Sequence, residues 1–146
     1  MRVAVEELGI DVPVVPVGVD GGGAMDLPND ARTAGWYRHG PGPTSAAGTT
    51  VVAAHVDDEA GAGPFARLRS LAAGAEVVVT DADGTRHAYA VTEVRSVPKP
   101  EVPLDDVFDR TGGPRLVLVT CGGAWDGERR SYSDNVLVTA RRADAP

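Results

Sequence analysis

The sequence lacks any long hydrophobic run and any recognisable leader. Its richest apolar stretch, Val12 to Val19, is interrupted by two prolines and a glycine. That stretch is well short of the roughly 18 residues that would suggest a membrane-spanning helix. The amino terminus, Met1-Arg2-Val3, does not have the charged-then-apolar layout of a signal peptide. These absences leave two interpretations, a cytoplasmic protein or a soluble piece separated from its targeting segment.

Positive charge is also scarce, because 14 Lys and Arg residues face 21 Asp and Glu residues, for a formal net charge of −7. An acidic chain repels phosphate backbones and anionic lipid head groups. Nucleic acid is therefore not an expected partner, and neither is electrostatic docking onto a membrane. At 146 residues the chain has the length of one domain. The predicted organisation is a single domain over residues 1–146.

Cysteine occurs once, which excludes an intramolecular disulfide. The lone cysteine is either a small buried hydrophobe or a reactive thiol. No Cys-x-x-Cys or His-Glu-x-x-His spacing is present, and the three histidines are scattered. The carboxylate run Asp57-Asp58-Glu59 fits a solvated loop at least as well as a calcium site. The sequence predicts no metal and no cofactor.

Strand signals, in contrast, are abundant. Turns containing Gly, Pro or Asp separate seven segments rich in β-branched residues. These segments are Val3–Leu8, Val12–Val17, Thr49–Ala54, Glu76–Thr80, Arg86–Val97, Leu116–Thr120 and Val136–Ala140. Asp83-Gly84, between two of them, is a strong hairpin signal. The pattern predicts one mostly-β domain, either a barrel or a sandwich.

Helical signals are few and short. Phe65, Leu68 and Leu71 recur at a spacing of three, which predicts about two helical turns from Pro64 to Leu71. Gly74 follows, where a left-handed cap is expected. Single turns of helix are predicted over Asp30–Tyr37 and Leu104–Phe108.

The segment around Cys121 is the most informative for chemistry. The apolar run Leu116–Thr120 leads directly into Cys121, and two glycines follow it. A strand end would hold the thiol on a rigid support, and the glycines would let a substrate carbonyl and backbone amides come close. His55 follows the run Thr49–Ala54 in the same way. An imidazole beside the thiol would favour the thiolate and later protonate a leaving amine.

These residues also have less reactive interpretations. A buried, inert cysteine and a surface or core histidine remain open on position alone. His39, in a Gly/Pro-rich loop, and His87, in a strand, are expected to be structural or solvated. Arg129 and Arg130 lie in the loop after Cys121, where an arginine could offer two fixed donors to an oxyanion. A pair of solvated charges fits that position equally well.

Taken together, these segments resemble the sortases, specifically the actinobacterial group called class F. The resemblance runs from about Gly9 to Arg142 and depends on the order and spacing of several motifs. The motifs are IDVPVVPVG at 10–18, GWY at 35–37, VVAAHVD at 51–57, FARL at 65–68, LVTCGG at 118–123 and RSYSDNV at 130–136.

The resemblance implies a closed β-barrel of about eight strands with short connecting helices. It implies a cysteine transpeptidase that cleaves an LPxTG-like sorting signal through a thioester on Cys121 and transfers the acyl group to an amine of the cell wall or a pilin. His55 would be the general acid and base. Arg130, or Arg129 in its place, would stabilise the oxyanion and position the signal. Thr120 would help form the substrate pocket, and no cofactor is implied.

Two positions depart from the family pattern. Ala54 stands where members often have glycine before the histidine, and Asp134 stands at the distance from the cysteine where better-known sortases have arginine. The resemblance also implies an extracytoplasmic protein held by an N-terminal membrane helix that these 146 residues do not include. The domain is expected to be a monomer.

Three other functions remain as alternatives. A cysteine peptidase or hydrolase would use the same residues and release the product to water. An L,D-transpeptidase should show His-Gly-Cys in succession, whereas Thr120 precedes Cys121 here. A catalytically inactive barrel that binds a peptide would have no need of an activated thiol.

Overall fold

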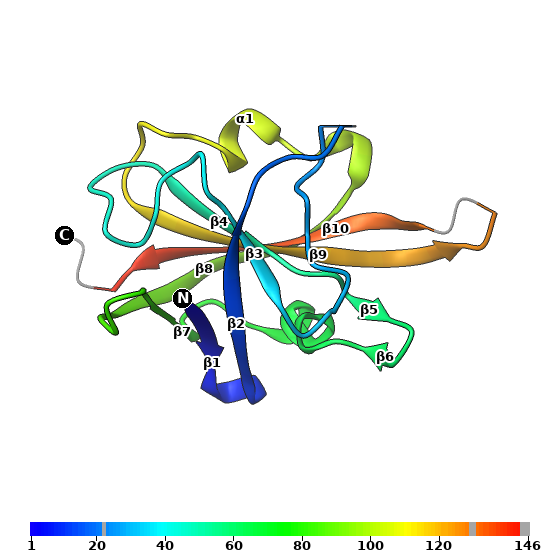
Figure 1. The fold of residues 1–146 in the computed structure, drawn as a ribbon, viewed down its shortest axis with the longest axis horizontal. Helices are drawn as coiled ribbons and strands as arrows, with labels where there is room; N and C mark the ends of the chain where they lie inside the picture. Colours follow the sequence, from blue (N-terminus) through cyan, green and yellow to red (C-terminus); the bar gives the residue numbers. More distant parts are fainter. Residues whose placement is uncertain (22, 129–130, 144–146) are drawn as a thin grey trace.

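A closed β-barrel organises the chain in the computed structural model, which describes residues 1–21, 23–128 and 131–143 (Figure 1). The order around the barrel is β1-β2-β3-β4-β9-β10-β8-β7. The strand bounds are β1 (Arg2–Val5), β2 (Ile10–Val17), β3 (Ala34–Tyr37), β4 (Thr49–Ala53), β7 (Glu76–Thr80), β8 (Arg86–Pro98), β9 (Arg115–Asp126) and β10 (Ser131–Arg142). A separate small hairpin pairs β5 (Asp57–Asp58) with β6 (Gly61–Ala62). The predicted closed barrel of about eight strands is confirmed.

The helices are short and lie between strands. They are the 3₁₀ segments η1 (Glu6–Leu8), η2 (Pro64–Ser70) and η3 (Lys99–Glu101) and the α-helix α1 (Leu104–Val107). None of the helices in the described ranges is long and apolar enough to cross a membrane. The helical turns predicted over Pro64–Leu71 and Leu104–Phe108 are confirmed within a residue. Gly74 has a positive φ of 94° but is not the predicted cap, because η2 ends at Ser70 and its C-cap, Leu71, is extended.

Parallel pairing of β4 with β9 decides where the chemistry-bearing residues lie. Thr49 pairs with Arg115 and Ala53 with Val119, whereas most other neighbouring strands are antiparallel. Parallel strands need a long crossover, which here contains η2, β7, β8 and α1. Because both strands run in one direction, their pairing ends at the same edge of the barrel.

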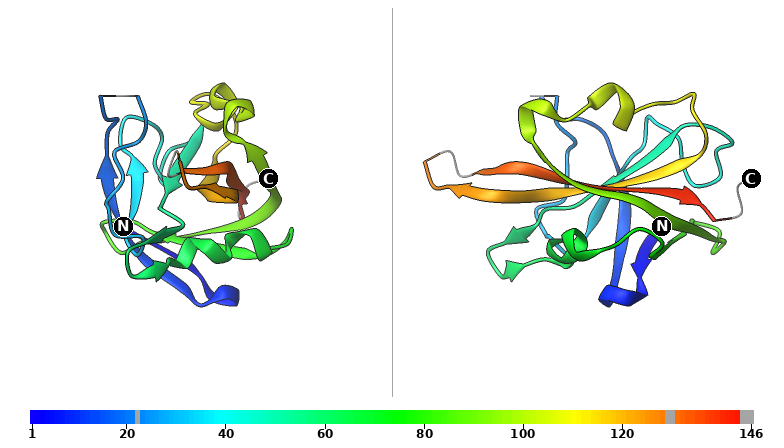
Figure 2. Two further views of the ribbon diagram at one scale, coloured as in Figure 1. Left: turned by 90° about the vertical axis from the view of Figure 1, so that its right-hand side faces the viewer. Right: turned by 180° about the vertical axis from the view of Figure 1, so that it is seen from behind.

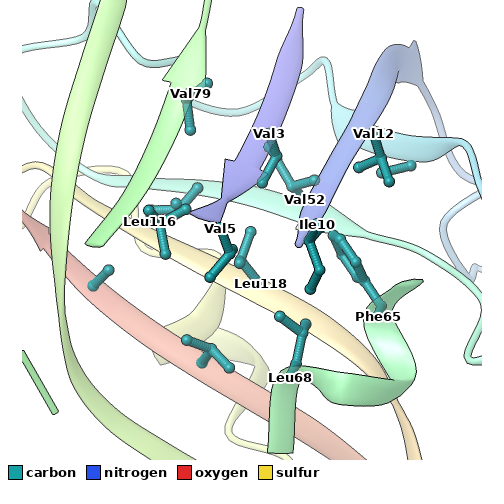
Figure 3. Close-up of a cluster of buried hydrophobic side chains, with 14 of the residues drawn as sticks. Val3, Val5, Ile10, Val12, Val52, Phe65, Leu68, Val79, Leu116 and Leu118 are labelled. Atoms are coloured by element: carbon teal, nitrogen blue, oxygen red, sulfur yellow. The ribbon is translucent and has the colours of Figure 1, made fainter. Parts of the chain in front are cut away.

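Two apolar clusters occupy opposite faces of β4 and β9, since successive side chains on a strand point to opposite sides. Val52 and Leu118 belong to the larger cluster, which fills the barrel (Figure 3). Val51 and Val117 belong to a smaller cluster, together with Val107 of α1. The even-numbered residues of these strands therefore build the barrel core, and the odd-numbered residues face the side covered by α1.

Helix η2 closes the larger cluster from one side. Phe65 and Leu68 are both fully buried and point toward Ile10 of β2 (Figure 3). Burial of an apolar side chain of this size is worth roughly 1.5–3 kcal/mol. The Phe/Leu spacing that predicted this helix therefore marks core contacts of the barrel.

Two local predictions were wrong. Residues 34–37 form strand β3 instead of a helical turn, pairing in parallel with β2 and antiparallel with β4. A Cβ atom at Gly35 would lie 2.9 Å from Val17, so the glycine lets the two strands approach. At the start of the chain, β1 ends at Val5 and residues 6–8 turn through η1, with Gly9 at a φ of 66°. Strand β3 forms because it pairs with partners that are distant in the sequence. Strand β1 ends early because the chain turns locally at η1.

Candidate active site

His55 and Cys121 lie at the same level of two neighbouring chain segments. The last parallel pair is Ala53 with Val119, and the Ala54 amide donates to the Val119 carbonyl at 3.1 Å. Two residues further along each chain come His55 and Cys121. Residues two apart on a strand share a face, so both side chains follow Ala53 and Val119 to the same side. Both residues line one groove.

Thr120 ties these two segments together. Its side chain is 3% exposed, and its hydroxyl donates to the Ala54 carbonyl at 2.9 Å. The residue before Cys121 is therefore bonded to the residue before His55. A buried hydrogen bond of this kind contributes about 1 kcal/mol net, and more is lost when one partner remains unpaired. Thr120 thus fixes the spacing of the two candidate catalytic residues.

Cys121 does not lie at a strand end, contrary to the sequence prediction. Strand β9 continues to Asp126 as a ribbon with β10 that extends beyond the barrel (Figure 1, Figure 2). What ends near Cys121 is the pairing with β4, which leaves one edge of β9 open. The cysteine is therefore held within a long strand and still borders open space.

A β-bulge follows directly after the cysteine. Gly122 pairs with Asp134 and Trp125 with Tyr132, so two residues of β9 oppose the single residue Ser133. Gly123 has a φ of 76°, and a Cβ atom there would lie 2.3 Å from the Ser133 hydroxyl oxygen. Glycine is required at this position both for its backbone conformation and for space. The predicted close backbone approach beside Cys121 is thus an approach between strands.

The groove that contains His55 and Cys121 has a volume of about 610 Å³. Its walls are mainly apolar and come from α1, from β9 and from the segment before β3. Leu104, Phe108 and Met25 are examples from the two flanking segments. Such a surface suits apolar side chains of a peptide, because their burial removes hydrocarbon from water.

A second, smaller pocket of about 270 Å³ borders Cys121. Asp57 and Asp58 of β5 line it, as do Arg69 of η2 and Tyr132 of β10. The Tyr132 hydroxyl donates a short hydrogen bond to the Asp57 carboxylate. This bond raises the pKa of Tyr132, because the neighbouring carboxylate disfavours a phenolate. Cys121 therefore borders both an apolar groove and a smaller pocket that contains charged and polar side chains.

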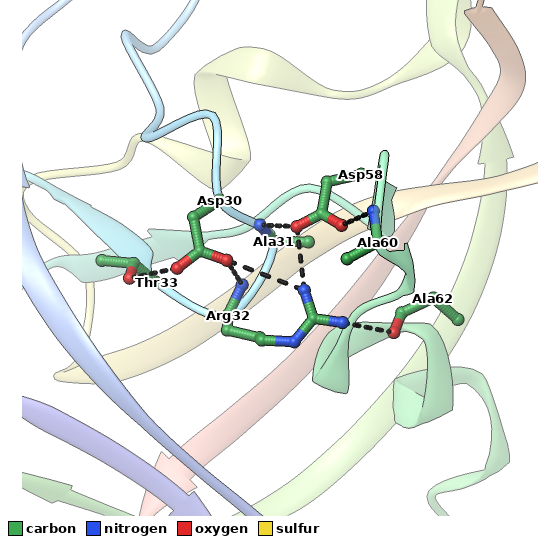
Figure 4. A network of polar contacts seen from close by, with 7 residues as sticks. All are labelled: Asp30, Ala31, Arg32, Thr33, Asp58, Ala60 and Ala62. Carbon is green, nitrogen blue, oxygen red and sulfur yellow. Dashed lines mark hydrogen bonds and ion pairs between the residues drawn. The ribbon is translucent and has the colours of Figure 1, made fainter.

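Asp58 holds one wall of the smaller pocket in place. Its carboxylate accepts hydrogen bonds from the amides of Ala31 (2.9 Å) and Ala60 (2.8 Å) and pairs with Arg32 at 2.9 Å (Figure 4). These bonds lower the pKa of Asp58, and the bond from Ala31 has the largest effect on it. Because Asp58 is occupied in this way, the acidic run is not a free ligand cluster. No group of three or more His, Cys, Asp or Glu residues in the described ranges could hold a metal ion.

The charges around Cys121 act on its thiol in opposite directions. Burial raises the pKa of Cys121 above the ordinary thiol value, and the negative charge of Asp57 adds to this effect. The nearby ammonium of Lys99 lowers the pKa and offsets part of the rise. The thiol is therefore mostly protonated at neutral pH and needs help to ionise.

Lys99 was not among the residues singled out from the sequence. Its Nζ donates to the Ser131 hydroxyl at 2.8 Å, at the start of β10. The lysine is far from Cys121 in the chain, and only the pairing of β8, β10 and β9 brings the two together. The one available signal was its rarity, since it is the only lysine in the sequence.

The two arginines and the other two histidines considered from the sequence are not part of the described site. Arg129 and Arg130 lie outside the described residues. His87 pairs with Asp81 at 2.8 Å, and His39 packs edge-on against Tyr37, so both have the expected structural surroundings. Arg110 lines the apolar groove but donates to the His39 carbonyl at 2.5 Å.

Comparisons with known proteins agree with this architecture. A family model described as a sortase domain matches residues 3–143. A comparison with curated proteins found no match. Among solved structures, sortase C2 of pilus island 1 from Group B Streptococcus superimposes with a TM-score of 0.73 at 20% identity, covering 99% of this chain and 73% of that one.

Sortase A structures superimpose similarly. That of Corynebacterium diphtheriae gives a TM-score of 0.72 at 17% identity, covering 99% of this chain and 60% of that one. Sortase A of Listeria monocytogenes gives 0.69 at 17% identity, covering 98% and 86%. At these identities the structural likeness establishes the fold, and the family model matches nearly the whole chain. This protein therefore belongs to the sortase family, whose members are cysteine transpeptidases that act at the cell surface.

Proposed function

We propose that this protein cleaves an LPxTG-like sorting signal through a thioester on Cys121 and transfers the acyl group to an amine of the cell wall or a pilin. The observation that most supports the proposal is the shared level of His55 and Cys121 at one edge of the barrel, facing one groove. Class F membership, an extracytoplasmic location with an N-terminal anchor, and a monomeric state form part of the same proposal.

The chemistry is a double displacement at one carbonyl carbon. The Cys121 thiolate attacks the Thr carbonyl of the signal, a C–S bond forms, and the Thr–Gly C–N bond breaks. His55, as imidazolium, gives its proton to the leaving glycine amine. An acceptor amine then attacks the thioester, its proton passes to His55, and the C–S bond breaks to restore the thiolate.

Arg130 is the proposed donor to the oxyanion that forms at each attack, with Arg129 as the alternative. A guanidinium offers two fixed N–H groups, which suits a tetrahedral oxyanion. Thr120 is proposed to help shape the substrate pocket. Its hydrogen bond to the Ala54 carbonyl supports this role, because it fixes the backbone on both sides of the reacting groups.

The two openings beside Cys121 suit the two substrates. The apolar groove fits the Leu and Pro side chains of a sorting signal. The smaller pocket places the Asp57 carboxylate near the thiol, where it would attract a cationic amine. This arrangement favours transfer to an amine over simple hydrolysis, which remains the second candidate because water reaches the same pocket.

The proposal is tested by cleavage of a fluorogenic LPxTG-type peptide, with and without a glycine-based amine. We expect native protein to give the amide product when the amine is present and Cys121→Ala to give none. Product that appears only as free acid, whatever the amine concentration, would establish the hydrolase instead. No cleavage of several signal variants, with or without the amine, would indicate an inactive peptide-binding barrel.

A further inference from the structure

We propose that Lys99 is a catalytic cation of this site, whose ammonium stabilises the Cys121 thiolate before it attacks and again when the acceptor expels it. The inference rests on the proposed thioester chemistry for its role in turnover. Its effect on the free thiol can be observed without any substrate.

The barrel order places Lys99 within reach of the thiol. Val97 of β8 pairs with Asn135 of β10, and Asn135 pairs with Cys121 of β9. Neighbouring strands are about 4.8 Å apart, so Val97 and Cys121 are separated by the width of one strand. Lys99 follows Val97 by two residues, and its flexible four-carbon stem lets the ammonium cross β10 to the cysteine.

A hydrogen bond holds the ammonium in this position. Nζ donates to the Ser131 hydroxyl at 2.8 Å, in a partly buried setting. The Ser131 hydroxyl in turn donates to the Tyr132 carbonyl at 3.2 Å. Pro98 and Pro100 flank the lysine and restrict its backbone. The bond to Ser131 therefore positions the ammonium before any substrate arrives, close enough to Cys121 to lower the pKa of its thiol.

Several charged or titratable groups surround the thiol from different elements. Asp57 of β5 opposes the thiolate, and Tyr132 of β10 is hydrogen-bonded to that carboxylate. His55 faces the groove after β4, and Arg69 of η2 lines the smaller pocket. Asp134 of β10 accepts a hydrogen bond from Ser96 on the neighbouring strand. Lys99 is the one cation among the described residues that acts directly on the thiol.

The residue type is also unusual for this chain. Lys99 is the only lysine, and arginine supplies the rest of the 14 Lys and Arg residues. An ammonium is a compact point charge, whereas a guanidinium spreads its charge over a planar fork. A point charge suits a single sulfur atom.

Lys99 acts twice in each turnover. It stabilises the thiolate that attacks the signal carbonyl, and the same thiolate is the leaving group when the acceptor amine breaks the C–S bond. The lysine keeps its proton throughout, since His55 carries the protons between the leaving and entering amines. Lys99 thus lowers the free energy of the Cys121 thiolate at both steps.

The test measures the rate of Cys121 alkylation by iodoacetamide from about pH 6 to about pH 10, a range that spans thiol ionisation. Lys99→Met removes the charge, Lys99→Gln keeps a donor for Ser131, and Lys99→Arg keeps the charge. Arg95→Met is the matched control, because Arg95 is an exposed cation on β8, the strand that leads into Lys99, and pairs with Glu93 at 3.2 Å.

We expect Lys99→Met and Lys99→Gln to alkylate about tenfold more slowly near pH 7, with the midpoint of the profile moved to higher pH, because loss of the ammonium raises the thiol pKa. Lys99→Arg should keep most of the rate, and Arg95→Met should match the native protein. If Lys99→Met and Lys99→Gln are folded, as shown by thermal unfolding, and follow the native profile, the proposal is wrong.

Peptide cleavage separates this inference from the proposed function. If the Lys99 substitutions change the alkylation rate but the native protein cleaves no peptide, the transpeptidase proposal is wrong. The effect of Lys99 on the thiol is then still supported. Mass spectrometry gives a further check, because Lys99 is the only side-chain primary amine. Acyl transfer from Cys121 to Lys99 would show that the lysine reacts as a neutral amine, and it would overturn the proposed cationic role.

Discussion

The two openings beside Cys121 differ in size, lining and support. The groove of about 610 Å³ is mainly apolar, whereas the pocket of about 270 Å³ carries Asp57, Asp58 and Tyr132. The odd-numbered residues of β4 and β9 form part of the groove wall, so it belongs to the barrel itself. The pocket wall comes from the β5–β6 hairpin, which Asp58 ties to the turn before β3. The Cys121 sulfur therefore lies between a mainly apolar surface of the barrel and the charged side chains of the β5–β6 hairpin.

This difference suggests a division of tasks. Apolar surface on a rigid sheet favours recognition of a defined peptide, because its burial energy depends on fit. Carboxylates near a thiol instead act through charge, at longer range and with sensitivity to pH and salt. The following predictions test whether peptide binding in the groove and the ionisation of the thiol beside the smaller pocket can be altered separately.

The largest effect is expected at His55, which borders the groove. His55→Ala should lower the rate of peptide cleavage by about 10²–10⁴, as for loss of a general acid and base. His87→Ala is the control, because His87 pairs with Asp81 and lines neither opening beside Cys121. Cleavage is followed with the fluorogenic peptide at saturating concentration. A His55→Ala rate within a few-fold of native would remove His55 from the mechanism.

An intermediate effect, on peptide binding, is expected when a charged side chain is introduced into the wall of the groove. Leu104 is 61% exposed, so Leu104→Glu should leave thermal stability nearly unchanged. It should raise KM for an LPxTG-type peptide about tenfold, as for loss of about 1.4 kcal/mol of apolar contact. Alkylation of Cys121 should stay native-like. Val15→Glu, at an exposed apolar residue that does not line this groove, is the control. Equal KM values for the two variants would contradict binding of the peptide in the groove.

The smallest effect is expected on the polar side. Asp57 raises the pKa of the Cys121 thiol, so Asp57→Asn should lower it and shift the pH–alkylation profile to lower pH. Near pH 7 we expect roughly a threefold faster reaction, because more of the thiol is ionised. Asp83→Asn, in the exposed turn between β7 and β8, is the control. A slower reaction for Asp57→Asn would show that the carboxylate supports the thiolate by another route.

Most strands could be predicted from the sequence because their patterns are local. Glu76–Thr80 has the predicted bounds, and the Asp83-Gly84 hairpin follows it, with Gly84 at a φ of 84°. Strand β3 was missed because its four residues are defined by pairing with β2 and β4, which no local pattern reports. Tertiary context overrides propensity in such short segments.

The same distinction applies to the candidate site. Cys121 and His55 could be identified because each follows an apolar strand segment, although their common level became clear only from the β4–β9 register. Lys99 and the Asp57–Tyr132 hydrogen bond could not be identified, because their partners lie far away in the chain. The continuation of β9 past Cys121 was also missed, since the two glycines suggested an end, whereas Gly122 pairs with Asp134 and Gly123 lies in a bulge.

The parallel register of β4 and β9 has a consequence for how such a chain can diverge. Ala54 and Thr120 are 66 residues apart and joined by one hydrogen bond. The distance between the histidine and the cysteine is therefore independent of the length of the intervening segment. Insertions or exchanges within the crossover can change the surroundings while the reacting pair keeps its geometry. A slip of one residue between the two strands, in contrast, would turn His55 into the barrel interior. The connections between β4 and β9 can therefore vary in sequence and length, whereas the register of these two strands must be kept.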